Sequence, residues 1–400
     1  MVERRETTVA GSPKRSAPSR FDALDGWRGL CAVMVVMLHA PIAGPIGQSA
    51  FVRNSYLFVD FFFVLSGFVI AHAWGRRLVT EHRWTSFIQA RFWRVYPLHF
   101  VMLIAFAAFE VAMRLLRGDT VPDPVNSPSA FIHNLFLTHS LGVTSSLGWN
   151  YPSWSISAEF FAYLTFAMLA VCVGKRLGLA LAVVAAGGLA LLFFRVGHLE
   201  THFEFGWLRC LVGFSFGAIL RIWFWEPLRL PVGIGASRGW TLLELAAVAY
   251  VGSFVSLAGH STLSLAAPFV FAAAIFIFAH EGGAISRLLK ARPIAWLGLL
   301  SYSVYMTHAF VLARMTNTAT IVEKLSGWRI FDPAVPEARV MATDLVGELT
   351  VLAILLTLTI GLSALTWRFV EVPGQALGKW IGARIPRPSH VSLDAYSSTP

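Results

Sequence analysis

The sequence predicts an all-α polytopic membrane protein, a bundle of about ten transmembrane helices. The 400-residue chain is 56% hydrophobic and only 14% charged, with a mean hydropathy of +0.64, whereas a soluble domain carries about 25% charged residues. Its apolar residues also gather in stretches of roughly 20, the length that a helix needs to cross a bilayer. These stretches are residues 25–43, 55–74, 95–116, 154–173, 177–194, 205–224, 239–258, 263–281, 294–315 and 346–368.

The two ends of the chain differ from its interior. Residues 1–21 are basic, rich in Ser, Pro and Ala, and lack the apolar core of a signal peptide. We expect this segment to be a disordered cytoplasmic tail, residues 22–373 to form one transmembrane domain, and residues 374–400 to form a second cytoplasmic tail. The apolar segment 131–141 is too short to cross and is expected at the interface or as a re-entrant segment.

The distribution of basic residues predicts the orientation in the membrane. An even number of spans places both termini on one side, which holds 23 of the 32 Lys and Arg residues, against nine on the other. Because cytoplasmic loops carry the excess of Lys and Arg, both termini are predicted to be cytoplasmic, in a protein of the cytoplasmic (inner) membrane. Basic inner loops also account for the net charge of +10, so no nucleic-acid partner is expected. The three cysteines stand at unrelated spacings and indicate neither disulfides nor a metal site.

The first predicted span carries two ionisable residues on one face. Arg28 lies near its start and His39 near its end, eleven residues later. At ~100° per residue, eleven steps return a helix to within about 20° of the same face, roughly 16 Å further along the axis. An ionisable residue inside a membrane is costly and suggests a functional site. The alternative is a histidine that a neighbouring helix satisfies.

The second and third spans add further candidates. Ser66 stands in the second span before a glycine; it is a candidate substrate contact, although a Ser-Gly step also lets helices pack closely. Asp60 lies near the outer interface of the same span, as a catalytic acid or as a hydrogen-bonded structural one. Arg91 and Arg94 share one helical face at the cytoplasmic entrance of the third span. Arginine forks suit phosphate oxygens, but the positive-inside rule alone also places arginines here.

The fourth and ninth spans hold the remaining candidates. Trp149, Tyr151 and Trp154 form an interfacial aromatic cluster typical of membrane anchoring, and Trp154 is also a candidate substrate contact. Glu159 lies five residues into the fourth span and needs a partner there. That partner is either His39, which would then be a general base held by an acid, or a structural one. The ninth span carries a polar stripe that lines either a substrate cavity or an interhelical network: Ser301, Tyr302, Tyr305 and His308.

Two other polar features favour structural roles. His198 and His202 have the i, i+4 spacing that can bind zinc on a helix, but no HExxH pattern accompanies them. We therefore expect a solvated loop face and no metal. Glu371 and Pro373 mark the exit of the tenth span into its tail.

Six stretches taken together resemble the acyltransferase-3 family of integral-membrane O-acyltransferases. They follow the family's order from near residue 22 to near residue 373, so the resemblance covers most of the chain. They are LDGWRGLCAVMVVMLH, VDFFFVLSGFVI, RFWRVYP, SWSISAEFFAYL, LSYSVYMTH and FVEVP.

The resemblance implies transfer of an acyl group, usually acetyl, from cytoplasmic acyl-coenzyme A to a hydroxyl. The acceptor is typically a sugar of an envelope or exported glycan, such as an exopolysaccharide or lipopolysaccharide, and sometimes a small molecule. By motif position, the resemblance implies that His39 is catalytic with Arg28 as its motif partner, that Arg91 and Arg94 bind the acyl donor, and that Glu159 is the motif acid.

Two departures from the family pattern leave the choice of acceptor open. Phe160 stands where a second acid is common, and Ala309-Phe310 replaces the Trp-Pro that often flanks the ninth-span histidine.

The residues fit the implied chemistry. Arg28, Arg91 and Arg94 would ring the cytoplasmic mouth and hold the phosphates of coenzyme A. His39, oriented by Glu159 or Asp60, would deprotonate the acceptor hydroxyl or first be acylated itself. The rival class is a secondary transporter or flippase for a glycan or lipid-linked substrate. It explains the spans equally well, but the sequence lacks paired inverted repeats and Gly/Pro-broken helices.

Overall fold

The computed structural model describes residues 20–117, 125–228, 237–334 and 339–384, and within these ranges its regular structure is helical apart from one isolated bridge between Ile42 and Ala342. Nearly all of the predicted N-terminal tail, and residues 385–400 of the C-terminal one, lie outside the described residues. The helices are α1 (Asp22–Leu38), α2 (Ala50–Arg53), α3 (Phe58–Glu81), α4 (Trp84–Arg117), α5 (Pro128–Leu135), α6 (Trp154–Val173), α7 (Leu177–Arg195), α8 (Gly206–Ile219), α9 (Glu226–Leu228), α10 (Ser237–Ala258), α11 (Ala267–Phe278), α12 (Ala284–Leu289), α13 (Arg292–Ser326), α14 (Leu345–Thr366) and α15 (Val372–Arg384).

The helices confirm an all-α membrane protein. In the described residues, 7 helical stretches are long and apolar enough to cross a membrane. One of them, Tyr151–Arg195, contains both α6 and α7, joined by a 3-10 turn. Helix α1 has 17 residues, and the apolar stretch Thr262–Phe278 is also short. Each predicted span overlaps a helix, but the count of about ten spans stays a prediction.

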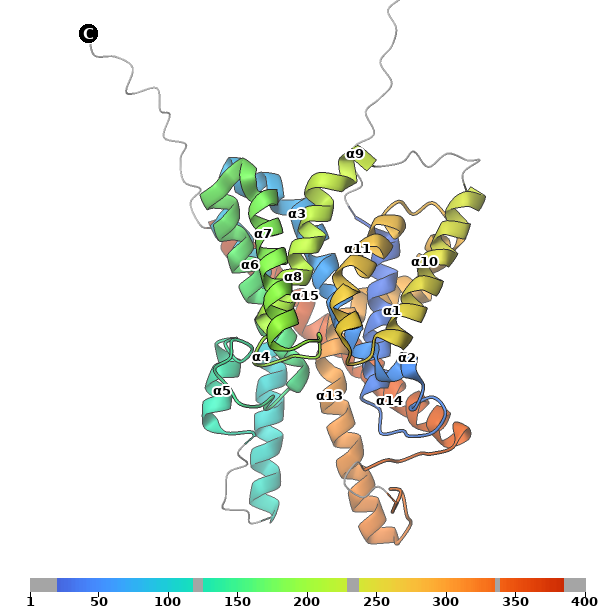
Figure 1. The fold of residues 1–400 in the computed structure, drawn as a ribbon. Coiled ribbons are helices and arrows are strands. Elements are labelled where there is room, and N and C mark those ends of the chain that lie inside the picture. Colours follow the sequence, from blue (N-terminus) through green and yellow to red (C-terminus); the bar gives the residue numbers. More distant parts are fainter. Residues whose placement is uncertain (1–19, 118–124, 229–236, 335–338, 385–400) are drawn as a thin grey trace, which may run out of the picture.

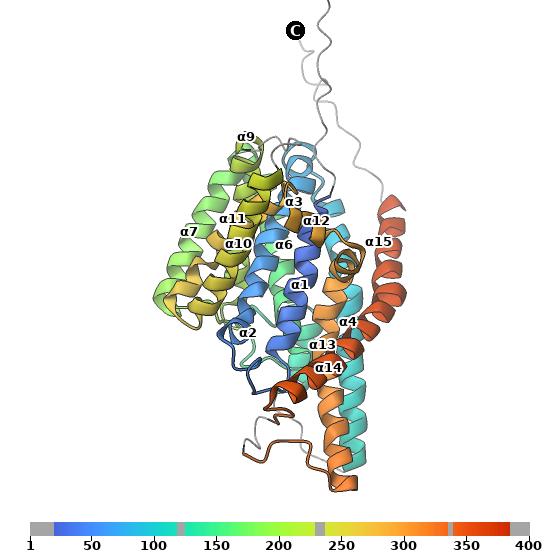
Figure 2. The same cartoon turned by 90° about the vertical axis from the view of Figure 1, so that its right-hand side faces the viewer.

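The long helices stand side by side in one bundle, with α1 near its centre (Figures 1 and 2). Helices α4 and α13 both extend beyond the bundle, away from the end at which α1 begins (Figures 1 and 2). Helix α14 continues through a π-helical turn, Trp367–Glu371, into α15. The predicted C-terminal tail therefore begins as helix, since α15 reaches Arg384. The short segment expected at the interface forms α5 and the turns after it.

Glycines set the closest helix contacts. A Cβ atom on Gly67 of α3 would lie 1.9 Å from the carbonyl oxygen of Phe214 in α8, and one on Gly217 of α8 would lie 1.8 Å from the carbonyl oxygen of Val64. Only a residue without a side chain permits this approach, as small residues do in membrane helix pairs. The close packing expected at the Ser-Gly step of α3 is thus present.

A second glycine contact brings α1 against α13. A Cβ atom on Gly29 would lie 2.7 Å from the backbone nitrogen of Gly298. Because Arg28 precedes the first of these glycines and Ser301 lies one turn beyond the second, the contact brings those two side chains within hydrogen-bonding distance, 3.0 Å. The packing of α1 therefore places a predicted site residue against the ninth predicted span.

Candidate active site

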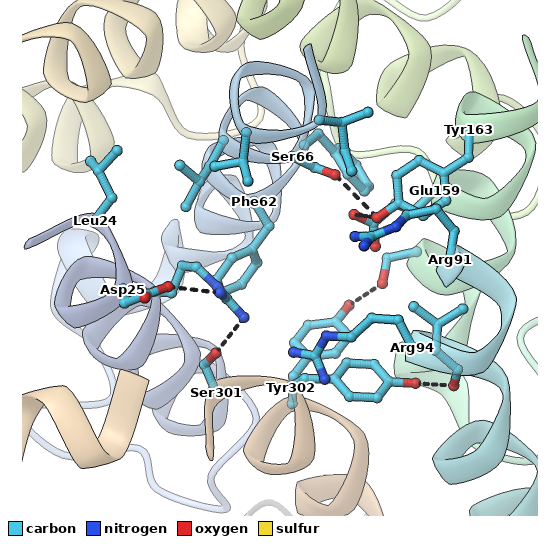
Figure 3. A pocket seen from close by; sticks show the side chains of 18 of the residues that line it. Leu24, Asp25, Phe62, Ser66, Arg91, Arg94, Glu159, Tyr163, Ser301 and Tyr302 are labelled. Carbon is cyan, nitrogen blue, oxygen red and sulfur yellow. Dashed lines mark hydrogen bonds and ion pairs between the residues drawn. The ribbon is translucent and has the colours of Figure 1, made fainter. Parts of the chain in front are cut away.

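A cavity of about 270 Å³ lies between α1, α3, α4, α6 and α13, at the end of the bundle where α1 begins. Figure 3 shows Arg91 and Arg94 on one wall and Asp25 and Ser301 on the facing wall. The predicted site residues that line the cavity are Arg28, Ser66, Arg91, Arg94, Glu159, Ser301 and Tyr305. Residues far apart in the sequence thus meet around one space.

Arg28 is held at the mouth of this cavity by two partners. Its guanidinium donates to Asp25 at 3.0 Å, one turn earlier on α1, and to the hydroxyl of Ser301 at 3.0 Å. Asp25 also accepts from Arg20 at 2.7 Å, so one carboxylate separates two arginines that line the cavity. The Arg28 guanidinium remains accessible to an incoming anion, since its side chain is 29% exposed.

Arg94 is tied to the far end of the chain. It forms an ion pair with Glu371, which lies in the π-helical turn and also accepts from Ser303 of α13 at 2.7 Å. The guanidinium lies over the ring of Tyr302, 5.3 Å from its centroid. From the sequence, Glu371 is expected only to mark the end of a span. It stands 277 residues from Arg94, so no local pattern could pair them.

Arg91 faces a short polar chain on the opposite helix. It lies beside Tyr163 and Glu159 of α6. The Tyr163 hydroxyl donates to Glu159 at 2.6 Å and lies 3.2 Å from the hydroxyl of Ser66 on α3. Within the described residues, the buried Nε of Arg91 has no hydrogen-bond partner. A buried polar atom without a partner calls for an explanation such as an absent ligand, and this one belongs to a group that suits phosphate oxygens.

Two hydroxyls mark the inner end of the cavity. Ser155 and Tyr305 both line it, and the Ser155 hydroxyl donates to the Tyr305 oxygen at 2.9 Å. The Tyr305 ring centroid lies 5.9 Å from that of His308, one turn further along α13, and His308 lies 5.2 Å from His39. The cavity therefore ends against a layer of side chains behind which His39 lies.

The His39 ring is oriented by the backbone of its own helix. His39 follows the last residue of α1, and its Nδ1 lies 2.8 Å from the carbonyl oxygen of Val35. A carbonyl oxygen only accepts, so this bond assigns the hydrogen to Nδ1 and leaves the lone pair on Nε2. The carbonyls of the last turn of a helix lack helical partners, which makes Val35 available. A neutral His39 thus presents a basic Nε2.

Neither acid expected to orient His39 does so in this structure. Arg209 of α8 donates to both oxygens of Asp60, at 2.9 and 2.7 Å, with both side chains almost fully buried. Glu159 accepts from Tyr163, one turn further along α6. In this structure each acid bonds a different donor, Arg209 for Asp60 and Tyr163 for Glu159, in place of the expected pairing with His39. Arg209 is the partner that sequence analysis missed.

Trp154 lies in the layer around the Asp60–Arg209 pair. Its ring is buried, with the guanidinium of Arg209 5.4 Å from the centroid, and His202 packs edge-on against it at 5.1 Å. Burial, followed by the charge of Arg209, lowers the pKa of His202 to about 4. His202 therefore packs against a tryptophan while its side chain stays partly exposed on the loop, so the solvated loop face stays a prediction. The role of Trp154 as a substrate contact stays a prediction.

Metal-ligating and thiol groups are scattered. Among the described residues, no three His, Cys, Asp or Glu side chains gather at a distance suited to one ion. Cys31, Cys172 and Cys210 are free. The site consists instead of arginines, hydroxyls and histidines.

Comparison with known proteins agrees with this arrangement. A family model described as an acyltransferase domain matches residues 21–368. The chain is 35% identical over 168 residues to Protein 2 in picA locus of Rhizobium radiobacter, which covers 38% of this chain and 84% of that protein. It is 38% identical over 112 residues to the acyltransferase MdmB of Streptomyces mycarofaciens, 27% of this chain and 26% of that protein.

A longer stretch of the chain is similar to a peptidoglycan O-acetyltransferase. It is 23% identical over 384 residues to the peptidoglycan O-acetyltransferase OatA of Listeria monocytogenes, which covers 88% of this chain and 55% of that protein. The chain thus spans about half the length of OatA. No solved structure matches. Since the family model covers most of the chain and the helices suit a membrane, the protein belongs to the acyltransferase-3 family and is a membrane acyltransferase.

Proposed function

We propose that the protein transfers an acyl group, most simply acetyl, from cytoplasmic acyl-coenzyme A to a hydroxyl of an envelope or exported glycan. The observation that carries this proposal is the arginine-lined cavity, which begins at Arg28 and ends against the side chains around His39. Helix α1 carries Arg28 near its start and is followed by His39, so one helix would position both an anion-binding group and a base.

The cavity suits the two halves of an acyl-coenzyme A. Its mouth carries arginines, whose forks match phosphate oxygens; they are Arg20, Arg28, Arg91 and Arg94. Further in, the lining is largely apolar and suits an extended pantetheine arm; it includes Val59, Phe62 and Phe63. Glu159 and Tyr163 then act as positioning residues that hold Arg91 toward the donor. The thioester would reach the inner end, near Tyr305.

The chemistry rests on the lone pair of His39. Its Nε2 would take the proton from the acceptor hydroxyl, whose oxygen then attacks the thioester carbonyl. Alternatively Nε2 attacks first, and the acyl group passes from the histidine to the hydroxyl. In both routes the Val35 carbonyl, in place of an acid, keeps Nδ1 protonated and stabilises the imidazolium. A cation at the end of a helix is also favoured by the helix dipole.

The class of acceptor is inferred from the named relatives. OatA is a peptidoglycan O-acetyltransferase, and BcsY of Komagataeibacter xylinus, 23% identical over 296 residues, is a putative membrane-bound transacylase. A glycan hydroxyl is therefore our proposed acceptor. The arginine cavity would face the cytoplasm in the inner membrane, where acyl-coenzyme A is available, with both termini on that side.

The test uses the purified full chain in lipid nanodiscs with radiolabelled acetyl-coenzyme A. We expect free thiol release and label transfer, both lost in His39→Ala at unchanged melting temperature. The matched control is His82→Asn, at an exposed residue with φ 48° beyond α3, a conformation that asparagine tolerates. Thiol release by His39→Ala at the wild-type rate would remove His39 from the mechanism. A folded wild-type protein that consumes no short-chain acyl-coenzyme A would favour the transporter class.

A further inference from the structure

Three rings meet at the far end of α1. The centroid of His39 lies 5.0 Å from that of Tyr151 and 5.2 Å from that of His308, and Tyr151 and His308 lie 6.0 Å apart. They come from three elements: the end of α1, the 3-10 turn Tyr151–Ser153 before α6, and α13. From the sequence, Tyr151 is expected only to belong to the interfacial aromatic cluster that includes Trp154.

Two polar atoms in this group are enclosed and unpaired. In the part of the chain that the structure describes, neither the Tyr151 hydroxyl nor Nε2 of His308 has a hydrogen-bond partner, although both atoms are buried. His308 Nδ1 lies 2.6 Å from the carbonyl oxygen of Tyr305, so Nδ1 carries the hydrogen and Nε2 is an acceptor. The group therefore offers one free donor, on Tyr151, beside one free acceptor.

An enclosed hydroxyl without a partner destabilises a folded protein, so its presence needs a reason. Acyl transfer supplies one, because its transition state places negative charge on the carbonyl oxygen. A donor fixed in an enclosed site stabilises that oxyanion strongly. Within the described residues, Tyr151 is the ring beside His39 that carries an uncommitted O–H.

We propose that the Tyr151 hydroxyl donates the hydrogen bond that stabilises the oxyanion of the acyl group during transfer at His39. This inference rests on the proposed function. The acceptor O–H passes its proton to Nε2 of His39 as the new C–O bond forms and the carbonyl oxygen becomes the oxyanion. The C–S bond then breaks, and the leaving sulfur takes the proton from Nε2 as a free thiol. His308 Nε2 would accept from a hydroxyl of the acceptor.

The test compares Tyr151→Phe with a matched tyrosine, Tyr56→Phe. Phenylalanine keeps the ring against His39 and removes only the hydroxyl. The Tyr56 hydroxyl donates to the Gly259 carbonyl oxygen at 2.6 Å, so its loss removes a hydrogen bond outside the cavity. We measure kcat and KM for acetyl-coenzyme A by thiol release in nanodiscs, together with the melting temperature.

For Tyr151→Phe we expect kcat to fall on the order of 100-fold, the cost of losing one oxyanion donor. The KM for acetyl-coenzyme A should change less than about twofold, because the hydroxyl acts only in the transition state. Its melting temperature should be unchanged or higher. Tyr56→Phe should show the reverse, a lower melting temperature at unchanged kcat.

The possible failures are distinct. An active wild type with an equally active Tyr151→Phe variant would overturn the inference and leave the proposed function intact. A melting temperature that falls in Tyr151→Phe as in Tyr56→Phe would show a structural hydroxyl and also overturn it. A wild-type protein that releases no thiol would remove the proposed function and this inference together.

Discussion

At the scale of single residues, the structure separates charges that hold the fold from charges that face the cavity. Asp60 and Arg209 satisfy each other in a buried pair, with the rings of Tyr56 and Trp154 beside the guanidinium. Arg28, in contrast, lines the cavity and stays partly exposed. Because the two charges of a buried pair satisfy each other, we expect a structural role for Asp60.

We therefore expect Asp60→Ala to lower the stability of the protein, without a direct effect on catalysis in the molecules that remain folded. Removing one partner of a buried ion pair leaves the other charge uncompensated, which costs about 3–5 kcal/mol. The measurement is the melting temperature in nanodiscs, with Asp22→Ala as control, since Asp22 pairs with Arg20 at 3.2 Å on an exposed surface where pairs contribute little. An Asp60→Ala protein of normal stability but without activity would restore Asp60 to the catalytic group.

At the scale of helices, backbone contact between α3 and α8 supports the cavity. Helix α3 lines the cavity through Ser66 and its neighbours, and its next residue, Gly67, meets the backbone of α8. Any side chain there must push the helices apart, because the atom in its way is a carbonyl oxygen that cannot rotate aside. The position of Ser66 thus depends on a residue with no chemistry of its own.

Gly67→Ala should lower stability by about 1–3 kcal/mol, the usual cost of overpacking, and should also raise the KM for the donor. The control is Gly252→Ala in α10, where a Cβ atom would meet nothing within 4 Å. That change should stabilise the helix by about 0.5–1 kcal/mol. The stability of both variants is measured by denaturation in nanodiscs. Equal stability of the two would mean that the helices separate without cost.

At the scale of the whole molecule, the mouth of the cavity and His39 lie toward opposite ends of one helix. Arg28 lines the cavity near the start of α1, and His39 follows its last residue. The described C-terminal helix, α15, rises toward the end of the bundle where α1 begins (Figure 2). A donor that binds among the arginines would therefore enter from the side on which α1 begins and α15 ends.

Labelling of single cysteines should test this orientation in intact cells. In a Cys172→Ser background, which removes the exposed native thiol, we expect Gln48→Cys to react with a membrane-impermeant maleimide from outside. Arg77→Cys, also at an exposed position, should react only after the cells are permeabilised. The opposite pattern would place the arginine cavity on the outer side and exclude cytoplasmic acyl-coenzyme A as its ligand.

The all-helical membrane class, the family and several polar residues that line the cavity were predictable from local features of the sequence. Spans of about 20 apolar residues and charges within them are local signals, and a spacing of eleven puts Arg28 and His39 on one face of a helix. The same logic could have found Tyr163, which lies one helical turn after Glu159.

Which polar groups pair depends on how the helices pack in the folded protein. Asp60 pairs with Arg209 across 149 residues, and Arg94 pairs with Glu371 across 277. No local sequence pattern predicts contacts between residues so far apart. From the sequence, Tyr151 is expected to be a membrane anchor. In the folded protein its hydroxyl is enclosed and its ring lies beside that of His39. Partner choice depends on which donor lies nearest to each acid after the helices have packed, and that packing is set by the glycine contacts of α1 and α3.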